Sequence, residues 1–243
     1  EVKITNAGTL SDNYDGENLT IVTGSAAYDN KNVGTGKTVA FTGFALAGDA
    51  AANYKLIAQP TDTTADITVK EITISGAAVE ASRIYNGTTD AKITNEGTPS
   101  VNYDGENLKV VAGKAAYDNK NVGKGKAVTF TGFALEGDAA ANYKLTAQPE
   151  AVTADITVKE IKIVDAVVET SKIYDGSTDA KITEKGTFDG LIDGDKVDIV
   201  TGKAAYDDKN VGNGKTVAFY DFALSGDDAA NYVLAAQPAS TTA

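Results

Sequence analysis

The sequence contains no cysteine, histidine, methionine or tryptophan among its 243 residues. Without cysteine there is no thiol nucleophile and no disulfide. Without histidine or cysteine, tetrahedral zinc sites, blue-copper sites and histidine-based acid–base catalysis are excluded. Carboxylates, amines, guanidinium groups and hydroxyls remain, so the first metal to consider is an oxygen-preferring ion such as calcium.

Aromatic residues are also scarce, at 7% of the chain, although the hydrophobic content of 42% is that of a folded protein. The core is therefore expected to consist of small and β-branched residues, with Tyr and Phe as its bulky members. No stretch approaches the 18 apolar residues of a membrane span, so no membrane insertion is expected. The net charge of −12 disfavours binding to nucleic acid and to anionic membranes.

The sequence consists of nearly three copies of one repeat unit. The string AAYDNKNVG begins at Ala26 and again at Ala115, 89 residues later, and the close copy AAYDDKNVG begins at Ala204. Residues 1–60 and 90–149 are identical at 46 of 60 positions. Solenoid periods run about 20–50 residues, whereas a unit of this length can hold a small core of its own. We therefore expect three tandem domains, at residues 1–68, 69–158 and 159–243.

The outer units are shorter than the middle one. Glu1 corresponds to Asp90, so the first unit lacks equivalents of residues 66–89. Ala243 corresponds to Ala154, so the third lacks the DITVKEI segment. The interpretation we favour is a fragment of a longer array. The alternative is that neighbouring chains exchange this segment, one chain lending a strand to the next.

Each unit shows strand patterns and no amphipathic helical run of ten residues. ADITVKEITI, from Ala65, alternates apolar and polar residues, and its phase shifts at Lys70-Glu71. Such a shift turns the side chains to the other face, which indicates two strands meeting at a junction between units. Strong turn signals stand at Asn86-Gly87 and Asp175-Gly176. GDAAANY, from Gly137, can form at most one helical turn.

The expected fold class is all-β: a linear array of tandem small β-sandwich domains of the immunoglobulin-like kind. The alternative is another mostly-β repeat, such as a β-grasp-like one. Tyr143 precedes a strand near the end of its unit, and Tyr54 and Tyr232 hold the same place. This position resembles the tyrosine corner, in which a hydroxyl bonds to nearby backbone, and the alternative is an ordinary core tyrosine.

The run Gly36-Lys37-Thr38 looks like the end of a phosphate-binding loop. That loop requires a glycine five residues before the Gly-Lys pair, and Lys31 stands there. The second copy also has Ala127 in place of the hydroxyl residue. We instead expect a β-turn, with Lys37 beginning the next strand and its ammonium in solvent.

Acidic loops are the remaining candidates for a metal. Asp193, Asp195 and Asp198 cluster in DGDKVD, and Asp227-Asp228 follow, but their spacing fits no EF-hand. Solvated loop charge is the simpler interpretation, so calcium stays an open possibility and no other cofactor is expected. Near-identical repetition argues against an enzyme, and we name no catalytic, cofactor-binding or metal-binding residues.

Three separated motifs carry a resemblance to a known family. They are KIYDGSTDAKI from Lys172, YDDKNVGNGKTVAF from Tyr206 and LSGDDAANYVLAAQP from Leu224. Together they resemble the YDG domain of bacterial surface proteins, which include adhesins like filamentous haemagglutinin. The resemblance covers essentially the whole chain, although the second copy reads Tyr85-Asn86-Gly87. It implies an extracellular location, on the cell surface or secreted, and it brings no catalytic residues.

The function expected from the repetition and the resemblance is structural. The repeats would form a stalk that spaces or displays an adhesive part of a surface protein. Alternatives are a filament subunit that assembles by strand exchange, and a module that binds glycans or proteins. The partners would be neighbouring repeats of the same protein, other copies of it, or surface glycans and proteins of host or bacterium.

Overall fold

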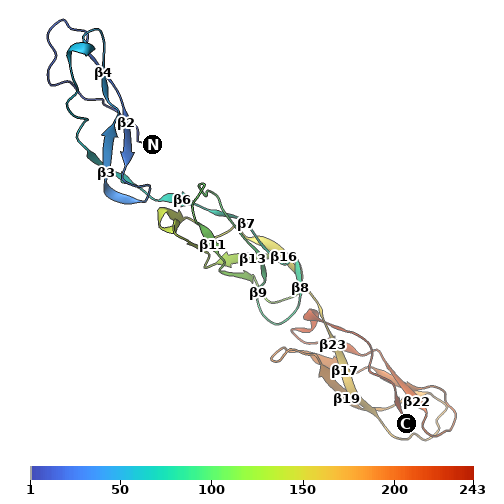
Figure 1. Cartoon of the computed structure of the whole chain (residues 1–243). Helices are drawn as coiled ribbons and strands as arrows, with labels where there is room; N and C mark the ends of the chain where they lie inside the picture. Colours follow the sequence, from blue (N-terminus) through green and yellow to red (C-terminus); the bar gives the residue numbers. More distant parts are fainter. Residues whose placement is uncertain (1) are drawn as a thin grey trace. The chain divides into compact units, whose positions relative to one another are not determined.

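The structure is a computed structural model that describes residues 2–243. The residues of this range form β-strands, three 3-10 turns and loops, and none of them forms an α-helix (Figure 1). The chain is thus all-β, as its alternating patterns predict. No helix among these residues has the length and apolar character that a membrane span needs.

The strands and 3-10 turns that the sequence repeats share follow one another in the same order, although residues 54–56 and 171–173 form no strand where their equivalents in the second repeat do. The first repeat contains β1 (Thr20–Val22), β2 (Ser25–Tyr28), β3 (Gly34–Thr42), β4 (Ala45–Ala47), η1 (Ala51–Asn53) and β5 (Thr63–Ile67). The second contains β6 (Lys70–Ile72), β7 (Ile74–Val79), β8 (Ser82–Ile84), β9 (Asp90–Ala91), β10 (Ile93–Pro99), β11 (Lys109–Val111), β12 (Lys114–Tyr117), β13 (Gly123–Thr131), β14 (Ala134–Glu136), η2 (Ala140–Asn142), β15 (Tyr143–Leu145) and β16 (Val152–Thr157). The third contains β17 (Lys159–Val168), β18 (Asp179–Ala180), β19 (Ile182–Asp189), β20 (Asp198–Val200), β21 (Lys203–Tyr206), β22 (Thr216–Tyr220), β23 (Ala223–Ser225), η3 (Ala229–Asn231), β24 (Tyr232–Leu234) and β25 (Thr241–Thr242).

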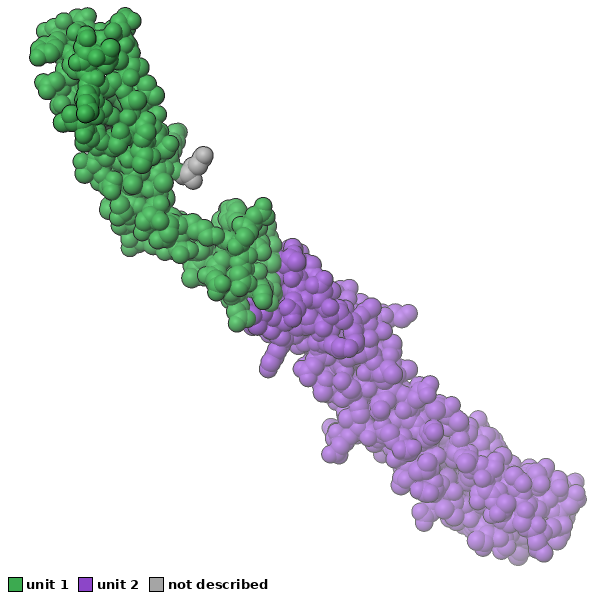
Figure 2. Space-filling view, in the orientation of Figure 1, with its two compact units in different colours: residues 1–73, 99–110, 135–147 green, residues 74–98, 111–134, 148–243 purple. Residues whose placement is uncertain are grey.

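Contacts divide the chain into two compact units, coloured separately in Figure 2. One unit consists of Glu1–Thr73, Pro99–Val110 and Leu135–Ala147, and the other of Ile74–Thr98, Val111–Ala134 and Gln148–Ala243. The division passes through the second repeat. Each unit therefore contains one of the two places where consecutive repeats meet.

In the first unit, the sheet β2-β3-β5 belongs to the first repeat, and β6 begins the second. β6 pairs in parallel with β15, with Tyr143 opposite Lys70 and Leu145 opposite Ile72. The two strands predicted around Lys70-Glu71 are thus present, and each pairs with a different repeat. A small core lies beside β6, formed by Ile72, Leu108, Ala139 and Tyr143.

In the second unit, only Val158 separates β16 from β17. β16 lies between β13, antiparallel, and β8, parallel, in the five-stranded sheet β8-β16-β13-β12-β9. β17 pairs antiparallel with β19 and, at its start, parallel with β24. The chain therefore passes from a sheet of the second repeat into a sheet of the third within one residue.

The third repeat has a core shared by its sheets. Side chains of β17, β20, β21, β22 and the turn before β23 meet in one buried cluster: Ile163, Val168, Ile199, Ala204, Val217, Phe219 and Phe222. Phe219 and Phe222 pack edge to face, with ring centroids 5.9 Å apart. The core is thus built from small and β-branched residues around a few aromatic rings, as the composition indicates.

The predicted turns at Asn86-Gly87 and Asp175-Gly176 are present. Both glycines have positive φ, +79° and +80°, a conformation that favours glycine. The side chains of Asn86 and Asp175 each accept a hydrogen bond from the backbone N–H two residues later. An Asn for Asp change keeps this acceptor, which is why YNG and YDG form the same turn.

The prediction of a β-turn at Gly36-Lys37, with the lysine ammonium in solvent, is wrong. β3 runs unbroken through this stretch, with a bulge between Gly34 and Lys37. The Lys37 side chain is only 9% exposed, and its Nζ lies 2.8 Å from Asp29 Oδ1 and 2.7 Å from Asn30 Oδ1. Two acceptors in the loop between β2 and β3 thus hold the ammonium out of solvent.

Candidate functional site: the loops where consecutive repeats meet

The AAYDNKNVG motif forms a hairpin loop that its own lysine holds in place. In the second repeat, Lys126 Nζ contacts Asn119 Oδ1 at 2.7 Å and Asp118 Oδ1 at 2.9 Å. Asn119 Oδ1 also accepts the N–H of Asn121 at 3.0 Å. We call residues 118–122, with their equivalents 29–33 and 207–211, the junction loop. These contacts tie the start of the loop to Lys126 of β13 and link Asn119 to Asn121, so the loop is held in a defined conformation.

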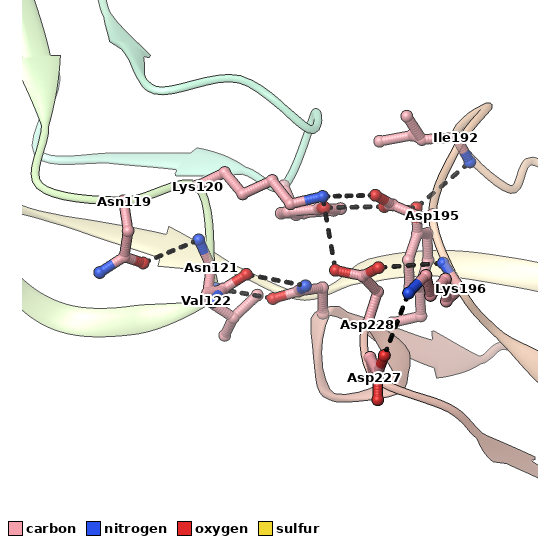
Figure 3. A network of polar contacts seen from close by, with 12 residues as sticks. Asn119, Lys120, Asn121, Val122, Ile192, Asp195, Lys196, Asp227 and Asp228 are labelled. Carbon is pink, nitrogen blue, oxygen red and sulfur yellow. Dashed lines mark hydrogen bonds and ion pairs between the residues drawn. The ribbon is translucent and has the colours of Figure 1, made fainter.

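The junction loop of the second repeat contacts the third repeat through paired amides (Figure 3). The N–H of Val122 donates to Asn231 Oδ1 at 2.9 Å, and Asn231 Nδ2 donates to Asn121 Oδ1 at 3.2 Å. Asn231 belongs to η3 and is buried, so its side-chain amide needs these partners. The single helical turn predicted for the GDAAANY motif places this asparagine.

Asp195 is the centre of a charged cluster at the same junction (Figure 3). Its side chain is 3% exposed, and its Oδ1 lies 2.6 Å from Lys120 Nζ. Its Oδ2 accepts hydrogen bonds from the hydroxyls of Tyr85 at 2.7 Å and Tyr232 at 2.6 Å. Lys120 Nζ also lies 3.4 Å from Asp228 Oδ1. A buried carboxylate is stable here because three donors surround it.

The contacts with Asp195 shift the pKa of this aspartate and of the three residues that donate to it. Burial alone would raise the pKa of Asp195, but the hydrogen bonds from Lys120, Tyr232 and Tyr85 outweigh it and hold that pKa below its ordinary 3.8. The hydrogen bond to Asp195 raises the pKa of Lys120. Burial, followed by the bond to Asp195, raises the pKa of both Tyr85 and Tyr232. Aspartate and lysine are therefore both charged at neutral pH, and the tyrosines are neutral donors.

Tyr85 adds a buried aromatic contact to this junction. It is 1% exposed, although it lies directly before the Asn86-Gly87 turn. Its ring packs edge to face on Tyr232, with centroids 5.4 Å apart, and Lys120 Nζ lies 5.9 Å from its centre. The second repeat thus contributes a ring, a hydroxyl and an ammonium to the third.

The junction between the first and second repeats uses the same positions. The N–H of Val33 donates to Asn142 Oδ1 at 2.9 Å, and Asn142 Nδ2 donates to Asn32 Oδ1 at 3.2 Å. Lys31 Nζ lies 2.9 Å from Glu106 Oε1, and the Tyr143 hydroxyl donates to the same glutamate. The hydrogen bonds of Tyr143 and Lys31 lower the pKa of Glu106, while burial and then Glu106 raise that of Tyr143 to about 12.

Three segments of the chain match the YDG domain family: residues 2–65, 68–151 and 157–242. Together these segments cover almost the whole chain. The chain belongs to the YDG domain family. Neither a curated protein nor a solved structure matches it. Each matched segment holds one junction loop, and the last two also hold the tyrosine of the YDG motif.

The YDG tyrosine has two environments in this chain. Tyr85, in the YNG form, is buried between the second and third repeats, whereas Tyr174, in the YDG form, is 58% exposed. Asp175 of the latter motif is held by Lys172, whose hydrogen bond, together with the N–H of Ser177, lowers the aspartate pKa to about 2. The turn is therefore formed in both YDG motifs, whereas only the ring of Tyr85 is buried.

Two of the five aspartates considered for calcium contact the same lysine. Asp195 and Asp228 lie on either side of Lys120, and Asp227 lies 3.6 Å from Lys196. Asp193 and Asp198 are exposed. Among residues 2–243 no group of three or more acidic side chains is arranged to hold a metal ion. The cation that balances this acidic loop is a side chain of the preceding repeat.

Tyr143 and its equivalents do not form the tyrosine corner. The hydroxyls of Tyr54, Tyr143 and Tyr232 donate to a carboxylate 37 residues upstream: Glu17, Glu106 and Asp195. The hydroxyl of Tyr232 accepts one backbone N–H, from Ile192, but 40 residues away. The residue is a core tyrosine that positions the acidic group of the junction.

Pairing between loops was missed by sequence reasoning. The strings KNV and AAN, which carry the paired asparagines, recur unchanged in every copy and could have indicated this pairing. A second missed signal is the repeated AQP. In each copy the glutamine Oε1 accepts the backbone N–H of a phenylalanine, and the glutamine Nε2 donates to the C=O of the same residue; the pairs are Gln59 with Phe44, Gln148 with Phe133 and Gln237 with Phe222. These glutamines complete the backbone pairing of a phenylalanine that the strands leave open.

Proposed function

We propose that this chain is part of the stalk of an extracellular bacterial surface protein, in which tandem immunoglobulin-like YDG repeats space or display an adhesive part. The observation that supports it is the reuse of one junction. The Val N–H and two asparagine amides, and a lysine–carboxylate pair, recur at both steps with nearly equal distances. Contacts that recur in this way can hold each repeat in a defined position relative to the one before it.

The polar side chains at the junction are paired with groups of the neighbouring repeat. Asn231 and Asp195 have their hydrogen-bond partners within the chain, and the lysine that faces them is charged and paired. A binding module would instead leave such convergent polar groups free for a ligand. The junction therefore supports a spacing role over a catalytic or ligand-binding one.

Spin labels placed across the second junction test this proposal. The chain has no cysteine, so Thr129→Cys and Lys185→Cys, both at exposed strand positions of consecutive repeats, label only the chosen sites. A stalk predicts one narrow distance distribution by pulsed electron paramagnetic resonance. In the double variant Lys120→Ala with Asn231→Ala the distribution should broaden, and with the exposed control Lys124→Ala it should stay narrow.

Two results would argue against the stalk. One is a broad distance distribution in the unmodified junction, which would mean that the loops do not hold consecutive repeats together. The other is specific binding of the whole chain on a glycan array, which would favour a binding module. In sedimentation velocity the stalk proposal predicts that the chain is a monomer at micromolar concentration.

A further inference from the structure

Three hydrogen-bond donors converge on the side-chain oxygen of Asn86. Its Oδ1 accepts the backbone N–H and the hydroxyl of Thr88, each at 3.1 Å, and it also accepts a hydrogen bond from the guanidinium of Arg83. The turn itself needs only the N–H of Thr88. The two further donors, one of them charged, suit an oxygen on which negative charge develops during a reaction. Asn86 is exposed, so water reaches this group.

The charged donor is held in place by its surroundings. Arg83 is the only arginine of the chain. Its guanidinium carbon lies 5.0 Å from the centre of the Tyr117 ring, and its Nη2 donates to the carbonyl of Thr88. The guanidinium is therefore positioned against Asn86 before any reaction begins, which is the condition under which a donor stabilises developing charge most effectively.

The residue after Asn86 supplies an unhindered nucleophile. Gly87 has no side chain to shield its backbone nitrogen, and its φ of +79° is a conformation that favours glycine. Because Asn86 Oδ1 accepts the N–H of Thr88, the asparagine side chain folds back along the segment that contains the Gly87 nitrogen. A nucleophile, an amide carbon and three donors to its oxygen thus occupy one turn.

A second Asn-Gly pair in the chain has the glycine without the charged donor. Asn213 stands directly before Gly214 and is exposed. The cation beside this pair, Lys215, lies 2.6 Å from Asp208 Oδ1 instead. Asn213 is therefore an internal reference against which the effect of the donors at Asn86 can be measured.

The third repeat shows that this turn accommodates a carboxylate. Asp175 occupies the position of Asn86, and its Oδ1 accepts the N–H of Ser177 at 2.9 Å. The same oxygen lies 2.9 Å from the Nζ of Lys172, which occupies the position of Arg83. An aspartate at position 86 would thus find its turn donor and its cation already in place.

We propose that Asn86 is a site of spontaneous deamidation, at which the turn's own groups convert the YNG motif into YDG. The backbone nitrogen of Gly87 loses its proton to a solvent base and attacks Cγ of Asn86, forming a new C–N bond. The bond from Cγ to Nδ2 then breaks, and Nδ2 leaves with a proton as ammonia. Water adds to the resulting cyclic imide and opens it to an acid, so the net change is the replacement of ammonia by water.

Arg83 also decides which acid is formed. Its hydrogen bond polarises the carbonyl that came from the Asn86 side chain, and water that attacks there yields aspartate. Attack at the other carbonyl yields isoaspartate, which lengthens the backbone by one methylene. There is little room for that change, because a Cβ on Gly87 would already lie 3.1 Å from Cγ2 of Ile192. Aspartate is therefore the main product in the folded chain.

Peptide mapping of the whole chain after incubation at mildly alkaline pH tests this proposal. Trypsin releases the two Asn-Gly pairs in separate peptides, residues 84–92 and 210–215. The peptide with Asn86 should gain about 1 Da severalfold faster than the peptide with Asn213. Chromatography against synthetic standards should show more aspartate than isoaspartate at position 86. A synthetic peptide of residues 84–92, incubated in the same way, should give a larger share of isoaspartate, because it lacks Arg83 and the fold.

Two variants of Arg83 isolate its contribution. Arg83→Ala removes the charged donor, so conversion should slow about tenfold and the share of isoaspartate should rise. Arg83→Lys installs the cation that the third repeat carries as Lys172, so it should keep most of the native rate and product ratio. Circular dichroism and urea unfolding establish that both variants fold before their rates are compared.

The proposal is overturned if Asn86 keeps its amide in the folded chain while Asn213 or the free peptide loses its own. It is also wrong if a folded Arg83→Ala variant converts at the native rate, or if the folded chain and the free peptide give the same product ratio. These outcomes leave the stalk untouched, since the stalk is tested by the distance distribution across the second junction.

Discussion

The two junctions share their amide contacts and differ in their charges. At the first, Lys31 is 66% exposed and has one carboxylate partner, Glu106. At the second, Lys120 is 36% exposed and lies between Asp195 and Asp228, beneath the ring of Tyr85. Asp228 stands where the second repeat has Ala139. The asparagine pairing is thus common to the two junctions, while the charged groups around the lysine differ.

The largest expected difference comes from Tyr85. Tyr85→Ala removes a buried ring and the hydroxyl bonded to Asp195, so the free energy of unfolding should fall by about 3–5 kcal/mol. The matched control is Tyr174→Ala at the same motif position, where the ring is exposed and the change should stay within about 0.5 kcal/mol. Urea unfolding followed by circular dichroism measures both. Equal losses in the two variants would show that the turn, and not the junction, carries the effect.

The second-largest difference in the free energy of unfolding is expected between variants of the two junction lysines. Lys120→Ala leaves the buried Asp195 with only its tyrosine donors, at a cost of about 2 kcal/mol, which is reduced by the partial exposure of the lysine. Lys31→Ala breaks a more exposed pair and should cost less than about 1 kcal/mol. The same unfolding experiment compares them. A larger loss for Lys31→Ala would reverse the ranking of the junctions.

The asparagines test what the junctions have in common. Asn231→Ala and Asn142→Ala each remove an amide that accepts one N–H and donates one hydrogen bond, so both should cost about 1–2 kcal/mol. Hydrogen exchange of the Val122 and Val33 amides reports each site separately. Each amide should lose protection only in the variant of its own junction. Strongly unequal losses would mean that the amide pairing is not the shared part.

The smallest expected effect is a dependence on acid. The pKa of Asp195 is lower in the folded chain than its ordinary 3.8, so its stabilising contribution is complete above that pH and is lost as the pH falls through the folded pKa. Unfolding experiments between pH 5 and pH 2 should show a steeper loss of stability in the native chain than in Asp195→Asn. Parallel curves for the two proteins would indicate that this carboxylate does not titrate below its ordinary value when folded.

Much of the fold could be predicted because its signals are local. The 89-residue repeat, the strand pair around Lys70-Glu71 and the Asn86-Gly87 turn all follow from neighbouring residues. The junction could not, because Lys120 and Asp195 are 75 residues apart and Val122 and Asn231 are 109 apart. Neither the repeat period nor a turn motif predicts which loops of consecutive repeats contact one another.

The Gly-Lys motif shows the same limit at short range. Its glycines suggested a turn, but the conformation depends on where the lysine ammonium finds its acceptors. Those acceptors, Asp29 and Asn30, lie across the hairpin from Lys37. The pattern identified a backbone irregularity, and only the pairing of β3 with β5 shows it to be a bulge.

The single residue between β16 and β17 has a mechanical consequence. Tension applied along the chain would pass from one sheet to the next through Val158, with no slack to take up. In the third repeat β17 and β24 run parallel, although one opens the repeat and the other lies near its end. Pulling on the two ends would therefore load their hydrogen bonds together in shear, an arrangement that resists force far better than one in which the bonds open one after another.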